Sequence, residues 1–321
     1  MASQRPLAPG EQGFRRLGDV PRIERPPRSD FERQYLVQSR PAVVSGALDD
    51  WPALAKWSAD WFAGRFGDRV VQVNVSSSPR FTFSGRSRRE MTMRDAVARM
   101  RQGGGPEWFY MQLDDAGEAL PGLEEDIAVP TLVPLPHRSL EMKLWLGGEG
   151  NISPLHFHRY HYLLTQVVGG KRVVLFEPGQ LHRLYPDSVG LHHVSSVDID
   201  RPDLSRFPRL RRAASIETVI GAGDMLFIPA YWWHQVYSLD LAATISYSWL
   251  ADLSQCLVPG FFRQIGMGPI DRNPLWLRPA IGLARFLARG GNRQAAEAVA
   301  RLVVRAARRR PGTAARSAMA A

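Results

Sequence analysis

Short apolar runs separated by turn residues dominate the middle of the chain. Five of them are rich in β-branched or aromatic residues and are bounded by Gly, Pro and Asp. They are Leu140–Leu146, Tyr162–Val168, Arg172–Phe176, Met225–Ile228 and Ala242–Trp249. Many short strands with this punctuation predict a β-sandwich or barrel. We therefore expect a mainly β core.

Helical patterns flank this core on both sides. Aromatic residues at near-helical spacing between positions 51 and 62 predict helical turns that pack on the core. The segment Met93–Met100 predicts a helix that ends at the glycines of positions 103–105. Residues 275–309 carry apolar side chains at helical spacing, which predicts two amphipathic helices. Such helices pack on the barrel or form a homodimer interface.

Composition divides the chain into four parts. Residues 1–30 are rich in Pro and Arg and lack periodicity, so we expect a flexible N-terminal arm. Residues 31–253 form the β domain, with Pro186–Ile216 as an insert on its rim. Residues 254–310 form the C-terminal helical extension, and residues 311–321 form a disordered tail.

The formal charge of +10 does not by itself indicate nucleic acid. Lysine occurs only at positions 56, 143 and 171, and the many arginines are scattered, as GC-rich coding would produce. Cys256 is the only cysteine, which excludes an intrachain disulfide and a thiolate zinc cluster. The sequence contains neither a signal-like apolar run nor a membrane-length one, so we expect a cytoplasmic protein without membrane or nucleic-acid partners.

Two segments carry the candidate metal chemistry. In GNISPLHFH, His156 and His158 are two residues apart, so on a strand both imidazoles would point to the same face. In GAGDMLFIPAYWWHQV, Gly223 and Asp224 predict a tight turn, and His234 begins a further strand. Neutral imidazole nitrogens that converge in this way are typical ligands of a divalent metal.

The same segments resemble the two motifs of cupins. Five residues separate Gly150 from His156-x-His158, and five separate Gly223 from the proline that precedes His234. In cupins these hairpins face each other inside a double-stranded β-helix and bring their histidines onto one metal. The glutamate of the first cupin motif is missing here. The resemblance therefore implies a cupin or jelly-roll fold with a three-histidine metal site.

A closer resemblance is to the JmjC-like oxygenases, especially their asparaginyl-hydroxylase-like branch. It covers roughly residues 35–250 and includes WLGGEGNISPLH, GGKRVVLFEP, VDIDRPDLSRFP and GDMLFIPAYWWH in the family's order. In that family a His-x-Asp pair and a distal histidine bind Fe(II), and 2-oxoglutarate chelates the iron. His156 and His234 match the two histidines, whereas His158 stands at the carboxylate position.

The resemblance also implies a set of cosubstrate contacts. Lys171 lies where the family grips the distal carboxylate of 2-oxoglutarate, and Tyr110 resembles a tyrosine that contacts the same molecule. Ser153 occupies the place of a supporting hydroxyl residue. Ser248 falls where asparaginyl hydroxylases have an asparagine.

The function implied is hydroxylation, with O2 and 2-oxoglutarate, of a peptide, amino-acid or small-molecule substrate. Two alternatives stay open because His158 replaces a carboxylate. One is a three-histidine cupin dioxygenase that is independent of 2-oxoglutarate, and the other is a non-catalytic metal-binding cupin. Of the remaining histidines, strand alternation points His161 away from the ligands, and His192-His193 lie in the rim insert.

Overall fold

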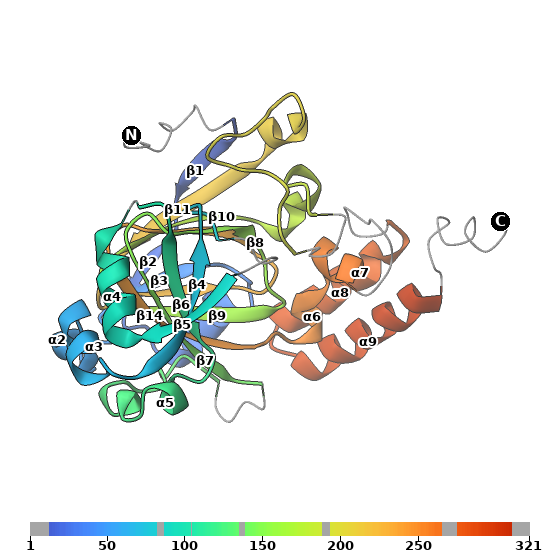
Figure 1. The fold of residues 1–321 in the computed structure, drawn as a ribbon. Coiled ribbons are helices and arrows are strands. Elements are labelled where there is room, and N and C mark those ends of the chain that lie inside the picture. The colour runs from blue at the N-terminus through green and yellow to red at the C-terminus, as the bar shows by residue number, and fades with distance from the viewer. Residues whose placement is uncertain are drawn as a thin grey trace.

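The computed structural model describes residues 13–81, 87–103, 105–134, 139–187, 193–264 and 275–309. Its centre is a β-barrel of two facing sheets, with helices α2–α5 and α6–α9 on opposite sides (Figure 1). The predicted mainly β fold is therefore confirmed.

The strands are short, as the punctuated sequence predicts. In chain order they are β1 (Arg15–Asp19), β2 (Arg22–Glu24), β3 (Ala42–Ser45), β4 (Val70–Ser76), β5 (Ser87–Thr92), β6 (Trp108–Leu113), β7 (Glu141–Gly147), β8 (Ile152–His156), β9 (Tyr160–Val168), β10 (Lys171–Phe176), β11 (Ala214–Ile220), β12 (Met225–Ile228), β13 (Trp233–Ser238) and β14 (Ala242–Leu250). The smaller sheet has the order β1-β11-β10-β13-β8, and the larger has the order β2-β3-β12-β9-β14-β7-β6-β4-β5.

The helices are mostly brief and precede or follow the barrel. The α-helices are α1 (Arg28–Phe31), α2 (Ala53–Lys56), α3 (Ala59–Arg65), α4 (Met93–Gln102), α5 (Ala116–Ala119), α6 (Leu253–Cys256), α7 (Pro259–Gln264), α8 (Arg278–Arg289) and α9 (Arg293–Arg309). The shorter helical turns are η1 (Glu32–Leu36), η2 (Leu123–Asp126), η3 (Pro178–Arg183), η4 (Pro208–Arg212) and η5 (Leu275–Leu277). Side-chain caps fix some of their starts: the hydroxyl of Thr92 accepts a hydrogen bond from the backbone of Asp95 at α4.

Eight of the strands form the double-stranded β-helix itself. Strands β8, β13, β10 and β11 pair antiparallel in one sheet, and β12, β9, β14 and β7 pair antiparallel in the other. The turn between β11 and β12 needs Gly223 at φ +91°, a conformation that favours glycine. Aspartate follows it as predicted, and its side chain accepts a hydrogen bond from the backbone N–H of Gly221.

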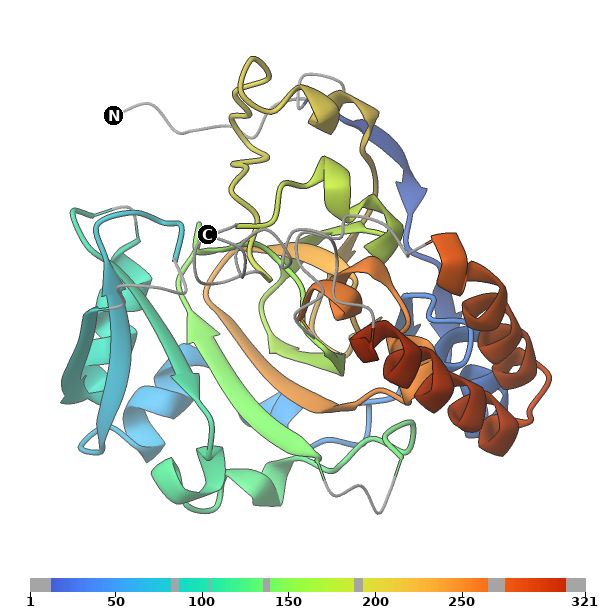
Figure 2. The same cartoon turned by 90° about the vertical axis from the view of Figure 1, so that its right-hand side faces the viewer.

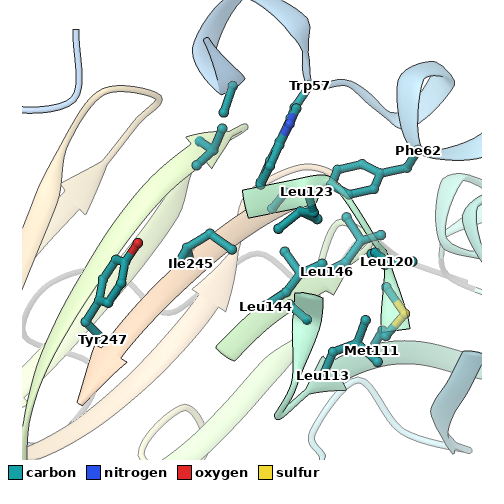
Figure 3. Close-up of a cluster of buried hydrophobic side chains, with 14 of the residues drawn as sticks. Trp57, Phe62, Met111, Leu113, Leu120, Leu123, Leu144, Leu146, Ile245 and Tyr247 are labelled. Carbon is teal, nitrogen blue, oxygen red and sulfur yellow. The ribbon is translucent and has the colours of Figure 1, made fainter. Parts of the chain in front are cut away.

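Strand alternation separates three layers of core. On the outer face of the larger sheet, side chains such as Leu144, Leu146 and Ile245 pack with Trp57 and Phe62 from the N-terminal helices (Figure 3). Alternate residues of the same strands face the barrel interior. Aliphatic side chains close one part of that interior; they include Val43, Val173, Leu175, Leu226 and Ile228. Polar residues line the remaining part of the barrel interior. The candidate site lies in this polar part.

The segment between β10 and β11 covers the outer face of the smaller sheet. It contains η3 and η4, and its apolar residues Leu181, Ile199 and Leu210 pack on Phe176 and Trp233 of the barrel. The predicted insert extends to residue 216, whereas the structure starts β11 at residue 214. The last residues of the predicted insert therefore belong to the barrel.

Part of the predicted N-terminal arm is regular structure, and this corrects the sequence-based interpretation. Residues 15–19 add to β11 as a parallel strand, and residues 22–24 pair with β3. Arg22 also reaches Asp224 and Ser45 with its guanidinium. Edge pairing needs backbone groups rather than an apolar pattern, so composition gave no signal for it. Residues 1–12 and the predicted tail at 311–321 lie outside the described residues.

The two predicted C-terminal helices are present as α8 and α9, which pack against each other at one side of the barrel (Figure 2). Apolar residues of both helices, including Ile281, Ala284, Ala300 and Val303, form their shared core. Among the described helices, none has the length and apolarity that a membrane span requires.

Candidate active site

The three predicted histidines meet inside the barrel. His156 ends β8 and lies opposite His234 of β13 in the antiparallel register, with 4.1 Å between their ring centroids. His158 lies just beyond β8 rather than on it, yet its ring centroid is 4.7 Å from that of His156. One ring nitrogen from each of the three histidines lies within 4.8 Å of the others. The structure therefore brings the three histidines together, and a turn rather than strand alternation positions His158.

Backbone carbonyls fix the tautomers of two of these histidines. The Nδ1–H of His156 donates to the carbonyl of Pro154 at 2.6 Å, and the Nδ1–H of His234 donates to that of Trp232 at 2.9 Å. A carbonyl only accepts, so in each neutral ring Nε2 carries the lone pair. Such backbone contacts orient metal-binding imidazoles and increase their basicity toward the metal.

The environment keeps the cluster unprotonated. Burial, and then the neighbouring His234 and His158, hold the pKa of His156 well below its usual range. Burial and the positive charges of nearby groups likewise hold the pKa of His158 well below that range, and burial lowers that of His234 to about 4. Neutral imidazoles are the form that binds metal.

A backbone hydrogen bond outside the β8–β13 pairing also connects the two histidine-bearing segments. The backbone N–H of Tyr231 donates to the carbonyl of His158 at 2.7 Å. Tyr231 has φ +65°, which is an uncommon conformation for a residue with a side chain. The bond therefore holds the strained turn before His234 against the turn that carries His158.

A small inner cavity of about 50 Å³ adjoins the histidines. It is lined by Tyr110, Trp145, Ser153, His156, His158, Tyr162, Leu164, Lys171, Ile228, His234, Val236 and Thr244. Three of the four predicted cosubstrate residues thus lie on the same cavity as the histidine cluster. Gly147 permits this arrangement, because a Cβ at that position would lie 2.5 Å from the ring of Tyr110.

Lys171 is buried at the inner cavity, where only 3% of its surface is exposed. It begins β10 and faces inward by the same alternation as Val173 and Leu175. Among the described residues no carboxylate pairs with it, and burial lowers its pKa to about 7. A buried ammonium without a counter-ion is costly, so this position suits an anionic group of a bound molecule.

A larger outer chamber of about 290 Å³ shares six lining residues with the inner cavity. Its other walls are Asn74, Phe81, Gln112, Glu141, Lys143 and Tyr160. The ammonium of Lys143 lies 3.0 Å from a carboxylate oxygen of Asp114 and 3.2 Å from one of Glu141. The chamber therefore offers polar and charged groups next to the histidines.

The fourth predicted contact, Ser248, lines neither cavity. It faces inward on β14 but pairs with Tyr162 in the strand register, farther along the barrel than Thr244. Thr244 lines the inner cavity instead, and its hydroxyl donates to Gln166 at 2.7 Å. Thr244 and Trp145 were not predicted as site residues, although alternation along their predicted strands points both to the face of the site.

The other histidines occupy the surroundings of the site. His161 is buried on the opposite face of β9, where its ring bonds Gln255 at 3.1 Å and accepts the N–H of Ala230. His193 lies in the rim segment with its ring 6.3 Å from that of His158, and its carbonyl accepts the N–H of Phe157. His161 thus has the expected supporting position. His192 lies outside the described residues.

Comparison with known proteins identifies the family. A model of the cupin-like domain matches residues 28–254. The chain is 34% identical over 237 residues to lysine-specific demethylase 8 of Xenopus tropicalis, across 72% of this chain and 52% of that protein. It is 27% identical to the human bifunctional peptidase and (3S)-lysyl hydroxylase JMJD7, across 68% of this chain and 79% of the relative.

A third relative is human tRNA wybutosine-synthesizing protein 5, which is 27% identical across 74% of this chain and 79% of its own length. The chain spans little more than half the length of the demethylase-named relatives that it matches in Xenopus tropicalis and Danio rerio. The region that the family model matches contains all three histidines. The chain therefore belongs to the cupin-like domain family of JmjC-type proteins.

Proposed function

We propose that this protein is an Fe(II)- and 2-oxoglutarate-dependent oxygenase that hydroxylates a peptide, amino-acid or small-molecule substrate. One observation carries the proposal: three lone-pair-bearing imidazoles and a buried, unpaired lysine line a single cavity. The first group fits a divalent metal and the second fits a carboxylate. A keto-acid that binds both is the simplest molecule to satisfy the two requirements.

The histidine cluster fits a metal ion by geometry as well as by residue type. The Nε2 atoms of His156 and His158 are 3.0 Å apart. Two nitrogens that are each about 2.1 Å from one ion, at a right angle, would have this separation. A shared cation would hold these two nitrogens at this distance when both carry a lone pair. Fe(II), when bound, would supply the activation of O2, and 2-oxoglutarate would supply the electrons.

The remaining cavity residues would hold and shield the cosubstrate. Lys171 would neutralise its distal carboxylate, and the hydroxyls of Tyr110 and Ser153 would donate hydrogen bonds to its oxygens. Tyr110 stacks on Trp145 with 5.9 Å between ring centroids, so the aromatic wall stays in place and excludes water. Ser248 is left out of this proposed clamp.

The outer chamber would hold the substrate. It opens beside His158, and its walls present amide, hydroxyl, carboxylate and ammonium groups that can orient a polar side chain. Relatives named lysyl hydroxylase and lysine-specific demethylase support a protein side chain as the substrate. The chamber volume of about 290 Å³ fits one extended side chain or a free amino acid.

The set of three imidazole ligands also fits a second candidate function. Imidazole at His158 leaves the metal unit one formal charge more positive than a carboxylate would. This difference favours an anionic chelator, but it also suits a three-histidine dioxygenase that binds its substrate directly. The buried Lys171 favours the first reading, because a barrel without an anionic cosubstrate would leave this lysine unpaired.

Oxygen consumption distinguishes the candidates. The Fe(II)-loaded protein should consume O2 only with 2-oxoglutarate present and release succinate in proportion, even without a second substrate. Consumption that never requires 2-oxoglutarate would favour the direct three-histidine dioxygenase. A large metal-dependent thermal shift without consumption under any condition would identify a non-catalytic cupin.

The predicted homodimer and cytoplasmic location remain proposals. Exposed apolar residues on the C-terminal helices, such as Leu283, Phe286 and Leu302, would form the dimer contact. Sedimentation of the intact protein and of Phe286→Glu would test the dimer. A monomer at micromolar concentration would contradict it.

A further inference from the structure

A second and larger cavity lies between the barrel and the C-terminal helices, apart from the histidine cluster. Its volume is about 610 Å³, which is within the usual range for small-molecule sites. Five separate segments form its walls: residues 37–40 before β3, the η3 turn, the β12–β13 connection, the α6–α7 region and helix α8.

The walls of this cavity are strongly basic. The charged residues among them are Arg40, Glu177, Arg183, Arg278, Arg285 and Arg289. Five arginines against one glutamate give a formal charge of +4 with His182 neutral. On α8 the spacings of seven and four residues place three of the arginines on one side of the helix. Helical geometry therefore makes this a continuous arginine face.

These arginines have few partners in the protein. Arg285 donates to the carbonyl of Leu257 at 2.8 Å, and Arg183 donates to that of Arg212 at 2.6 Å. The buried Nε–H of Arg183 has no acceptor in the described part of the chain. Within those residues, none of the five guanidiniums lies within 4 Å of a carboxylate, unlike Arg80, Arg89 and Arg172 elsewhere. Within the described residues, most of their donors are therefore available to a ligand.

Partial burial makes the excess of positive charge in this cavity more costly. Arg285 is largely covered, and burial followed by the charge of Arg289 lowers its pKa. Like charges gathered in a concave, partly desolvated space repel one another unless an anion joins them. Guanidinium groups present planar pairs of N–H donors, which match the oxygens of phosphate. The residue type thus points to phosphate more than to a single carboxylate.

We propose that this cavity binds a small organic anion with two or more phosphate groups. The +4 charge exceeds what one carboxylate would balance, and the volume accommodates a diphosphate with an attached organic group. The family match ends at residue 254, whereas three of the five arginines come from α8. Helix α8, which lies beyond the matched region, therefore supplies three of the five arginines of this site.

The cavity and the histidine cluster lie on two sides of one segment. Trp232 lines the arginine cavity, and its indole N–H donates to the carbonyl of Ser39, another lining residue. The backbone carbonyl of the same tryptophan accepts the Nδ1–H of His234. The two cavities share no lining residue, and no residue of helix α8 lines the inner cavity. Binding at one site is thus measurable without the other.

Calorimetric titration of the metal-free protein tests the proposal. Pyrophosphate and ADP are the probes, with orthophosphate as the single-phosphate comparison. We expect both probes to bind in one-to-one stoichiometry and orthophosphate to bind much more weakly. Equal affinity for pyrophosphate and ADP would indicate that phosphate alone is recognised, and tighter ADP binding would indicate a nucleotide-like ligand.

Matched double variants separate the cavity from general basicity. The variant R278Q/R289Q removes two cavity arginines, whereas R301Q/R305Q removes two exposed arginines of α9 outside the cavity and changes the net charge equally. Each lost guanidinium contact should raise the Kd roughly tenfold, so the first variant should bind about a hundred times more weakly. The second should bind like the wild type. All four positions are exposed, so folding is retained.

Three results would overturn the proposal. Pyrophosphate and ADP could both fail to bind at millimolar concentration, or both double variants could lose affinity equally. A single-stranded RNA oligonucleotide could also bind tightly while pyrophosphate does not compete, which would assign the basic surface to a polymer. None of these outcomes depends on Fe(II), 2-oxoglutarate or oxygen consumption, so failure here leaves the proposed oxygenase function intact.

Discussion

The inner cavity and the arginine cavity differ in how the fold brings positive charge to them. The inner cavity holds one ammonium, Lys171, buried on a strand and facing the barrel interior. The arginine cavity gathers five guanidiniums from loops and a helix at the protein surface. Strand alternation builds the first, whereas the approach of distant segments builds the second. The charge inside the barrel is therefore relieved by loss of the proton or by an anionic partner, while the outer charge is also hydrated.

The largest effect should follow from removing a histidine of the cluster. His234→Ala deletes one of three nitrogen donors, so Fe(II) affinity should fall by more than about 100-fold, because loss of even an outer partner can cost that much. Metal content after dialysis measures this. His193→Ala, outside the cluster, is the control and should retain metal. Equal metal content in the wild type and His234→Ala would show that the cluster is not the metal site.

Lys171 should make the stability of the cosubstrate-free protein depend on pH. Its pKa is about 7 in the folded state and near 10.5 when exposed, so the unfolded state binds more protons between these values. The free energy of unfolding should therefore rise with pH across this window, by up to roughly 1.4 kcal/mol per pH unit. Lys171→Met should remove the slope in urea titrations at pH 7 to 9.5. A slope that persists in the variant would place its cause elsewhere.

The stability of the rim segment should depend on the charged network around Arg80. Arg80 bonds Asp198, Asp200 and Gln235, and the two pairs with aspartate are only partly exposed. Arg80→Gln should therefore lower the free energy of unfolding by about 1–2 kcal/mol. The more exposed Arg89–Glu107 pair is the comparison, and Arg89→Gln should lower the free energy of unfolding much less than Arg80→Gln does. Equal losses of unfolding free energy in the two variants would contradict a structural role for the network.

The smallest change in the free energy of unfolding should follow from substitutions in the arginine cavity when no ligand is bound. R278Q/R289Q should change the free energy of unfolding by less than about 0.5 kcal/mol, since exposed residues without ion pairs contribute little. A slight stabilisation is expected because like charges are removed. Thermal unfolding in low salt measures it. A loss of several kcal/mol would mean that these arginines hold the helix in place, and the contrast between the two cavities would disappear.

Much of the barrel was predictable from the sequence because its strands are short, apolar and punctuated. The run Met225–Ile228 matches β12 in full, and the other four runs match their strands to within two residues at each end. The three histidines were predictable because they lie in two sequence motifs with a characteristic spacing. The cavity lining was only partly predictable, since the position of Thr244 follows from a register that one strand alone does not define.

Other features had no local signal. Residues 15–19 join the sheet through backbone pairing with β11, and their side chains are mostly exposed. His158 reaches the cluster through a turn whose conformation depends on the bond from Tyr231, which is distant in sequence. The scattered arginines gave no hint of a cavity, because α8 meets residues 37–40 and η3 only in the folded chain. Tertiary contacts, rather than sequence patterns, create these sites.

The most direct test of the account is an anaerobic spectral titration. Fe(II) is added to the wild type and to Lys171→Ala, and 2-oxoglutarate follows while the visible charge-transfer absorption of the chelate is recorded. We predict a band in the wild type, and in the variant a band that appears only at far higher 2-oxoglutarate, although Fe(II) binding is unchanged. The absence of a band in the wild type with iron demonstrably bound would contradict the account.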